Sequence, residues 1–257
     1  MAEKMTRVQT ADGVMPVFIV HPDQGGPFPT AVLYQDGVGF REQVKDNARR
    51  LAAGGFFCAA PDLFYRAGEG LHFDFATLAT LGADSPERER MMSTVRTVTP
   101  ERVATDTRAL LAAIVSEREA APGPKVCVGY CMGARMALHI AATLPDEFVA
   151  AAGIHPGALV TDQADSPHHE LSRVRAELYF AFAENDRTAT PELIDRFRDE
   201  MSRQGVRGVV ERLPGTSHGF AMADLPVYDR DAAERHFERT LGLWRRNLEQ
   251  QPTGIRG

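Results

Sequence analysis

This sequence has few cysteines, no excess of positive charge and no long apolar run. Only three of the 257 residues are cysteine, an odd number that does not suggest a disulfide framework. The formal net charge is −6 and no basic run is present, which argues against a nucleic-acid partner. No apolar run approaches the length of a membrane span, and none follows the polar start at residues 1–4. We therefore expect no signal peptide, no membrane partner and residence in the reducing cytoplasm.

The residues that are present suffice for one large core. Hydrophobic residues make up 44% of the chain, and segments of strand length alternate with segments of helical spacing. This alternation predicts a mostly parallel sheet with helices on both faces. We expect a single α/β domain over residues 1–257, with a cap or pocket segment at 67–100 and a frayed tail at 250–257. The expected strands are 6–9, 14–20, 30–34, 56–60, 126–128, 148–154, 178–183 and 206–213, and the expected helices are 42–53, 101–116, 134–142, 191–201 and 233–248.

The most informative motif is Gly129-Tyr130-Cys131-Met132-Gly133. It lies between an apolar strand segment and an Ala-rich helical segment, which is the strand–turn–helix context of a nucleophile elbow. The flanking glycines relieve crowding around an apex residue held in a strained conformation. Here the apex is Cys131, and the positive end of the following helix favours its thiolate. The pattern resembles an α/β-hydrolase with a thiol nucleophile.

An elbow of this kind needs an acid and a histidine further along the chain, in that order. Asp186 follows the expected strand 178–183 and is the candidate acid, with Glu184 as the second choice. His218 lies between small residues on the loop after the next strand and is the candidate base. For the developing oxyanion we expect two backbone N–H donors, one from Met132 and one from Gly37.

Together these motifs resemble the dienelactone hydrolase family, which is carboxymethylenebutenolidase-like. The resemblance covers residues 6–248 and implies a triad of Cys131, His218 and Asp186, no metal, no organic cofactor, and hydrolysis of a lactone or small ester as a carboxylic ester hydrolase through an acyl-thioester. The motifs that carry it are Tyr34-Gln35-Asp36-Gly37, Ala60-Pro61-Asp62-Leu63, the elbow, Glu184-Asn185-Asp186 and Ser217-His218-Gly219-Phe220.

Two positions depart from the family pattern. The resemblance implies a carboxylate that holds the resting thiol, and this chain has the shorter Asp36 where the family has Glu. The family also uses two arginines to bind a substrate carboxylate; one position is Met222 here, and the other falls near Arg88 or Arg90. Losing one guanidinium removes a contact of roughly 1.5–3 kcal/mol, which favours a neutral or bulkier ester or lactone over dienelactone.

Two functional hypotheses stay open at this point. The first is a thiol-dependent hydrolase of a small ester or lactone. The second is a relative without turnover, in which Cys131 serves a redox-sensing or ligand-binding protein. Cys131 could also be a buried core thiol, the reading that we prefer for Cys58 and Cys127 because both lie inside expected strands. The oligomeric state is not indicated by the sequence.

Overall fold

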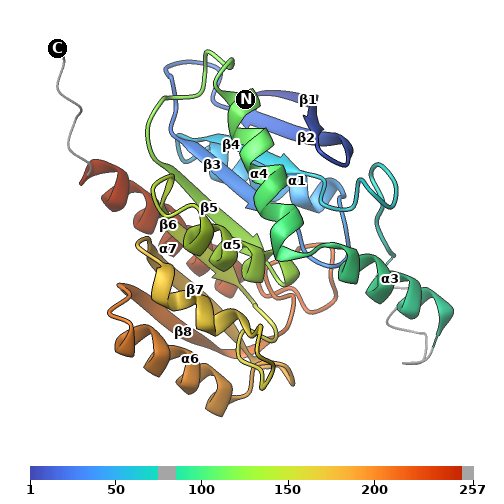
Figure 1. Cartoon of the computed structure of the whole chain (residues 1–257), viewed down its shortest axis with the longest axis vertical. Helices are drawn as coiled ribbons and strands as arrows, with labels where there is room; N and C mark the ends of the chain where they lie inside the picture. The colour runs from blue at the N-terminus through green and yellow to red at the C-terminus, as the bar shows by residue number, and fades with distance from the viewer. Residues whose placement is uncertain (75–84, 251–257) are drawn as a thin grey trace.

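The computed structural model describes residues 1–74 and 85–250 and is built around one eight-stranded sheet (Figure 1). The strand order is β1-β2-β4-β3-β5-β6-β7-β8; β1 and β2 pair antiparallel, β2 pairs antiparallel with β4, and the strands from β4 to β8 are parallel. The prediction of a mostly parallel sheet is therefore confirmed. The strands are β1 (Ala2–Thr10), β2 (Gly13–His21), β3 (Thr30–Tyr34), β4 (Phe57–Pro61), β5 (Lys125–Tyr130), β6 (Phe148–Ile154), β7 (Glu177–Asn185) and β8 (Gly208–Ser217).

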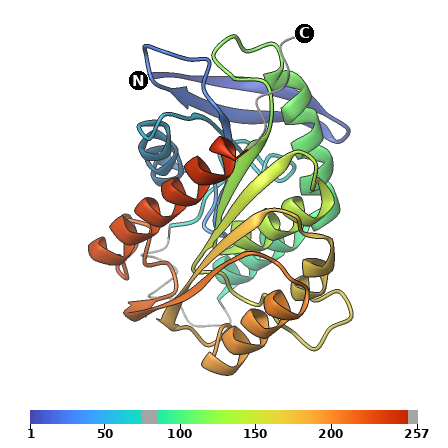
Figure 2. The same cartoon turned by 90° about the vertical axis from the view of Figure 1, so that its left-hand side faces the viewer.

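Helices cover both faces of this sheet, as predicted. Helices α1 and α7 lie on one face, while α4 and α5 lie on the other, and Figure 2 shows the two layers. Each face has its own apolar core, because alternate strand side chains point to opposite sides. The helices are α1 (Glu42–Ala52), α3 (Pro86–Thr97), α4 (Pro100–Ile114), α5 (Met132–Thr143), α6 (Pro191–Arg203) and α7 (Arg230–Glu249), with a 3-10 turn η1 (Pro167–Arg173).

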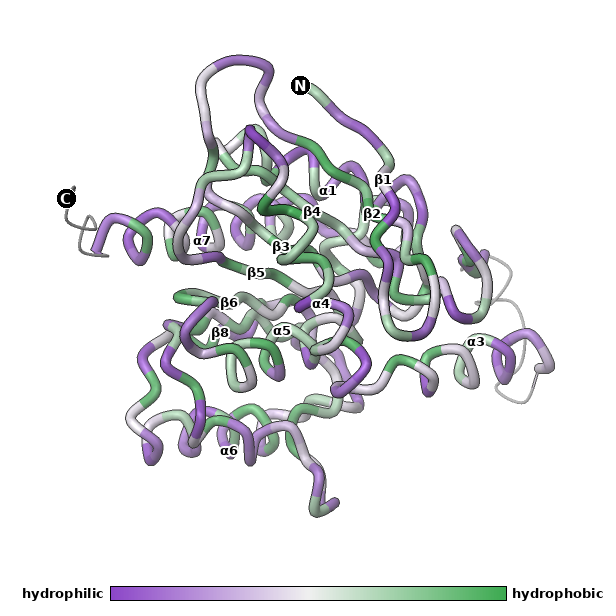
Figure 3. Tube along the Cα trace, turned by 45° about the horizontal axis from the view of Figure 1, so that its top comes forward, coloured by the Kyte–Doolittle hydropathy of each residue, from purple (hydrophilic) through white to green (hydrophobic). Residues whose placement is uncertain are grey.

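The hydropathy of the chain explains these layers. Strand β5 runs through the middle of the sheet and is coloured hydrophobic over much of its length in Figure 3. From Val126 to Tyr130 every residue of it is buried. Helix α7 alternates instead between polar and apolar residues, and its buried stripe includes Ala233, Phe237 and Trp244. The side chain of Asp229 caps this helix by accepting a hydrogen bond from the N–H of Ala232.

Two elements differ from the sequence-based expectation. The last strand, β8, continues through Pro214 to Ser217, where we expected a loop. In the segment 67–100 the structure contains the helix α3, whose cap is the Ser85 side chain and whose first residue is Pro86. Only Thr94 of this helix is buried, so the apolar periodicity that identifies a helix is weak there. Parts of the expected cap and tail, residues 75–84 and 251–257, lie outside the described residues.

Candidate active site

The candidate residues converge because each directly follows a parallel strand. Cys131 follows β5, Asp186 follows β7 and His218 follows β8. Since β5, β6, β7 and β8 are parallel neighbours, their carboxyl ends meet at one edge of the sheet. This edge is where open α/β sheets place their ligand sites.

The backbone at Cys131 has the strained geometry expected of an elbow. Its φ is 52° and its ψ is −112°, a conformation that L residues rarely adopt. The flanking glycines make the sharp turn possible. A Cβ on Gly129 would lie 1.9 Å from the carbonyl oxygen of Gly133, and a Cβ on Gly133 would lie 2.3 Å from that of Tyr34. The turn therefore packs strand β5, helix α5 and the end of β3 too closely for any other residue type.

His218 joins the thiol to the acid. Its Nε2 lies 2.9 Å from Sγ of Cys131, and its Nδ1 lies 2.5 Å from Oδ2 of Asp186. The Asp186 side chain is only 4% exposed, whereas the His218 ring is 34% exposed at the mouth of the site. The structure thus brings together the three residues that the sequence analysis selected for the triad.

The charges of these groups support one another. Burial acts to lower the pKa of His218, but the Cys131 sulfur and the Asp186 carboxylate beside its two nitrogens raise that pKa to about 11. Burial likewise acts to raise the pKa of Asp186, and the bond to His218 holds it below its usual value. Near neutral pH the arrangement therefore favours an imidazolium bonded to an aspartate carboxylate.

Two neighbours of Asp186 explain its position. Thr188 donates to Oδ1 of Asp186 from both its N–H, at 2.8 Å, and its hydroxyl, at 2.7 Å, which leaves Oδ2 for the histidine. Glu184, the second choice for the acid, accepts instead from the N–H of Gly215 at 2.8 Å and pairs with Arg212 at 3.3 Å. Glu184 thus ties β7 to β8, and Asp186 is the carboxylate on His218.

The two expected oxyanion donors lie on segments that touch. The loop after β3 contacts the first turn of α5, because the carbonyl oxygens of Tyr34 and Gln35 are the atoms nearest to a Cβ built on Gly133. Among the described residues, the N–H groups of Met132 and Gly37 donate neither to a side chain nor to a carbonyl in a loop or turn. Both groups are therefore available to a ligand oxygen.

Asp36 has a partner that the sequence did not suggest. Its carboxylate accepts from Nη1 of Arg41 at 2.7 Å, from Nη2 of Arg41 at 3.0 Å, and from the N–H of Val38 at 3.1 Å. Arg41 also donates from Nε to Asp224 at 2.5 Å. Burial acts to lower the pKa of Arg41, but the two carboxylates outweigh it and raise the pKa. In the described structure Asp36 thus bonds to Arg41 rather than to the Cys131 thiol, and its role in holding that thiol stays a prediction.

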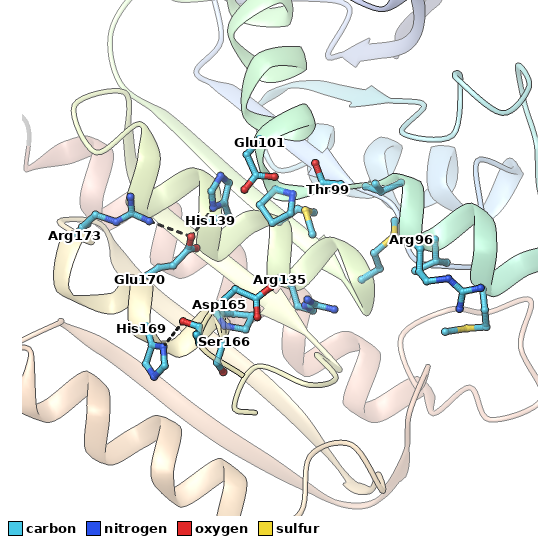
Figure 4. Close-up of a pocket in the computed structure, with 18 residues that line it drawn as sticks. Arg96, Thr99, Glu101, Arg135, His139, Asp165, Ser166, His169, Glu170 and Arg173 are labelled. Carbon is cyan, nitrogen blue, oxygen red and sulfur yellow. Dashed lines mark hydrogen bonds and ion pairs between the residues drawn. The ribbon is translucent and has the colours of Figure 1, made fainter. Parts of the chain in front are cut away.

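A cavity of about 690 Å³ opens beside the elbow, between α3, the start of α5 and the segment 164–173 (Figure 4). Met132 lines it, directly after Cys131, whereas Cys131 and His218 themselves are not among its lining residues. The predicted substrate-binding residues lie elsewhere. Arg90 pairs with Glu87 on the exposed face of α3, and the backbone N–H of Arg88 donates to the Ser85 cap. Neither is among the residues that line this cavity, so a substrate contact by either one stays a prediction.

The remaining position, Met222, belongs to the core. Its side chain is fully buried on the α1 face, where its sulfur accepts a hydrogen bond of 3.5 Å from Asn47. An apolar side chain suits this surrounding, and an arginine there would need a buried partner for its charge. The position is therefore a packing site in this chain.

A second histidine lies behind His218. His155 directly follows β6, has a φ of 39° and is fully buried, with its ring centre 5.3 Å from that of His218. Burial, and then the charge of His218, lower the pKa of His155 well below its usual value, so its ring is neutral. Its place directly after the expected strand 148–154 is the sequence signal for this position.

Metal binding and membrane spanning are two further possibilities for such a chain. Within residues 1–74 and 85–250, no group of three or more His, Cys, Asp or Glu side chains is arranged to hold a metal ion. In the same residues no helix is both long enough and apolar enough to cross a bilayer. Cys58, Cys127 and Cys131 are free thiols, and the first two are buried in the core as expected.

Similar proteins identify the family. The "Putative carboxymethylenebutenolidase" of Methylorubrum extorquens is 27% identical over 244 residues, which are 93% of this chain and 79% of that protein. The carboxymethylenebutenolidase of Pseudomonas sp. strain P51 is 25% identical over 239 residues, which are 90% and 89% of the two chains. The crystal structure of a "Putative Dienelactone Hydrolase" from Klebsiella pneumoniae superposes with a TM-score of 0.82 at 19% identity, over 97% of this chain and 99% of that one, and shares the fold. Residues 15–248 match the model of the dienelactone hydrolase family, and the chain therefore belongs to that family of hydrolases with the α/β-hydrolase fold.

Proposed function

We propose that this protein hydrolyses a carboxylic ester or lactone through an acyl-thioester on Cys131. The observation that carries the proposal is the chain of contacts from Sγ of Cys131 to Nε2 of His218, at 2.9 Å, and from Nδ1 of His218 to Asp186, at 2.5 Å. The strained elbow backbone supports the same role, since it exposes the thiol at the carboxyl edge of the sheet. Homologues named as carboxymethylenebutenolidases support the ester or lactone class.

In the first half of the reaction the thiolate of Cys131 attacks the acyl carbon, and the carbonyl oxygen becomes an oxyanion. The N–H groups of Met132 and Gly37 stabilise that charge. The carbon–oxygen bond to the alcohol then breaks, and the His218 imidazolium gives its proton to the departing alkoxide. For a lactone, this alcohol stays attached to the acyl group.

In the second half, neutral His218 takes a proton from a water molecule that attacks the acyl carbon of the thioester. The carbon–sulfur bond breaks, the acid leaves, and the thiolate and imidazolium are restored. Asp186 fixes the imidazole tautomer throughout and favours its protonated form. A thiol nucleophile works only while it is reduced, so the proposal also favours a reducing compartment such as the cytoplasm.

The test is steady-state hydrolysis of a panel of short-chain aryl esters and a dienelactone. We expect Cys131→Ala to lose at least about 1,000-fold in kcat/KM, the scale seen when a nucleophile is removed. Cys58→Ala is the matched control, because that thiol is buried in the core, and it should retain turnover. Equal turnover by Cys131→Ala would reject the proposal. Covalent labelling of Cys131 without turnover of any substrate would favour the redox-sensing or ligand-binding alternative.

A further inference from the structure

The cavity beside the elbow presents one row of α5 to any ligand. Met132, Arg135, Met136 and His139 line it and follow the spacing of a single helix face. On the opposite side, Met92 and Val95 of α3 line the same space. The cavity therefore combines an apolar, thioether-rich wall with a cation, at a volume of about 690 Å³ that suits a ligand larger than a short-chain ester.

Arg135 differs from the other basic side chains of this cavity. The guanidinium of Arg96 pairs with Glu89, while Arg173 and His139 both pair with Glu170. Arg135 makes no ion pair and no side-chain hydrogen bond with any residue in the described part of the chain, and its Nε is buried without a partner. A partly buried guanidinium costs free energy unless an anion accepts its hydrogen bonds and balances its charge. Figure 4 draws its side chain beside the cavity, between the segment of Asp165 and helix α3.

Besides Glu170, which pairs with Arg173, the two carboxylates Glu101 and Asp165 line the cavity. Both residues are exposed to solvent, where water and salt screen their charge. Arg135 is only partly exposed, so its attraction for an anion is screened less. It also lies three residues after Met132, about 4.5 Å along the helix from the proposed oxyanion donor. Arg135 and the proposed oxyanion donor thus lie within one turn of the same helix.

We propose that Arg135 is a specificity-determining residue that binds a carboxylate of the substrate. The preferred substrate is an ester or lactone with an apolar body, packed against Met92, Val95 and Met136, and an anionic end on Arg135. This inference rests on the proposed function, because it concerns the substrate of the same site. It assigns the anion contact to α5, a location different from the positions of Arg88, Arg90 and Met222.

The experiment compares two esters of matched length, the para-nitrophenyl monoester of suberic acid and para-nitrophenyl octanoate. For each enzyme the quantity is the ratio of kcat/KM for the anionic ester to kcat/KM for the neutral ester. Wild type should prefer the anionic ester, and Arg135→Gln should lower the ratio about 10- to 100-fold, as expected when a charge-assisted contact is lost. Arg135→Lys should keep part of the wild-type ratio, because lysine has the positive charge but lacks the planar guanidinium that makes two parallel hydrogen bonds.

Arg198→Gln is the matched control for net charge. Arg198 lies on α6, exposed and paired with Asp195, outside the cavity, and its substitution removes one positive charge as Arg135→Gln does. An unchanged ratio in Arg198→Gln and a lowered ratio in Arg135→Gln are expected. The proposal is overturned if wild type prefers the neutral ester, if Arg135→Gln keeps the wild-type ratio within about twofold, or if both variants change it equally.

The anion site on Arg135 can also be tested if the proposed hydrolysis is wrong. If wild type turns over neither ester, protection of the Cys131 thiol from iodoacetamide by suberate still tests Arg135. Protection that is present in wild type and lost in Arg135→Gln supports the anion site even then. Equal labelling with and without suberate in wild type overturns it.

Discussion

The buried ion pair of Asp36 and Arg41 gives a prediction whose size follows from the structure. Asp36→Asn keeps the shape of the side chain but removes the charge and one of two parallel hydrogen bonds to the guanidinium. The side chains of Asp36 and Arg41 are only 3% and 7% exposed. Removing one partner of such a pair leaves the other charge buried, at a cost of about 3–5 kcal/mol.

The remaining partner of Arg41 sets the expected value within that range. Asp224 still accepts from Arg41 in the variant, but its side chain is 37% exposed and its charge is better screened. We therefore expect Asp36→Asn to lower the free energy of unfolding by about 3 kcal/mol. Asp224→Asn is the matched control, since it removes a carboxylate from the same guanidinium, and should cost about 1 kcal/mol or less.

Urea denaturation at neutral pH measures both values. The double variant Asp36→Asn with Arg41→Met should lose about 2 kcal/mol less free energy of unfolding than the two single variants lose in sum. The reason is that the double variant leaves no buried charge unpaired. A loss below about 1 kcal/mol for Asp36→Asn, or equal losses for Asp36→Asn and Asp224→Asn, would refute the reasoning. Iodoacetamide labelling of Cys131 in Asp36→Asn distinguishes two roles of Asp36, a structural one in its loop and a direct one at the thiol. A labelling rate near that of wild type indicates a loop anchor, whereas a large fall indicates that Asp36 activates the thiol.

Three further predictions concern the elbow, a buried histidine and the acid. Gly133→Ala should cost more than about 3 kcal/mol in urea denaturation, because its Cβ would lie 2.3 Å from a carbonyl oxygen, whereas Gly242→Ala, with open space at that position, should stabilise α7 by about 0.5–1 kcal/mol. Burial lowers the pKa of His236 to about 3, so the stability present above its unfolded pKa near 6.5 is lost as the pH falls toward 3. His236→Phe should reduce the slope of the free energy of unfolding against pH by about 1.4 kcal/mol per pH unit in this range. An unchanged slope would contradict the lowered pKa of His236. Asp186→Asn should lower kcat/KM by at least about 100-fold, while Glu184→Gln should keep kcat/KM within about threefold of wild type. A larger loss in Glu184→Gln than in Asp186→Asn would identify Glu184 as the acid instead.

Much of the fold could be predicted because its signals are local. The segments 30–34 and 148–154 are short apolar runs between turn residues, and both are strands with those bounds in the structure. The glycines of the elbow encode the sharp turn by themselves, since a Cβ on either would meet backbone atoms. The chain order of nucleophile, acid and histidine then selected Cys131, Asp186 and His218. In the structure His218 lies within hydrogen-bonding distance of both Cys131 and Asp186.

Other features depend on distant contacts that sequence patterns do not carry. Arg41 and Asp224 are 183 residues apart, so the bond between them appears only in the folded chain. Helix α3 was missed because its apolar periodicity is weak, although the Ser85-Pro86 start is a helix signal that could have identified it. Arg135 follows Met132 at helical spacing, but that spacing alone does not tell whether it faces a cavity or solvent.

The central claim is that Cys131 carries the acyl group during turnover, and the most direct test is to detect that intermediate. Wild type is mixed with para-nitrophenyl acetate, quenched with acid during the steady state, digested, and examined by mass spectrometry. We expect an acetyl group on the peptide that contains Cys131, held as a thioester that hydroxylamine removes, and none on that peptide in Cys131→Ala. Rapid turnover with no acetyl group on Cys131, or with the acetyl group on another residue, would contradict the account.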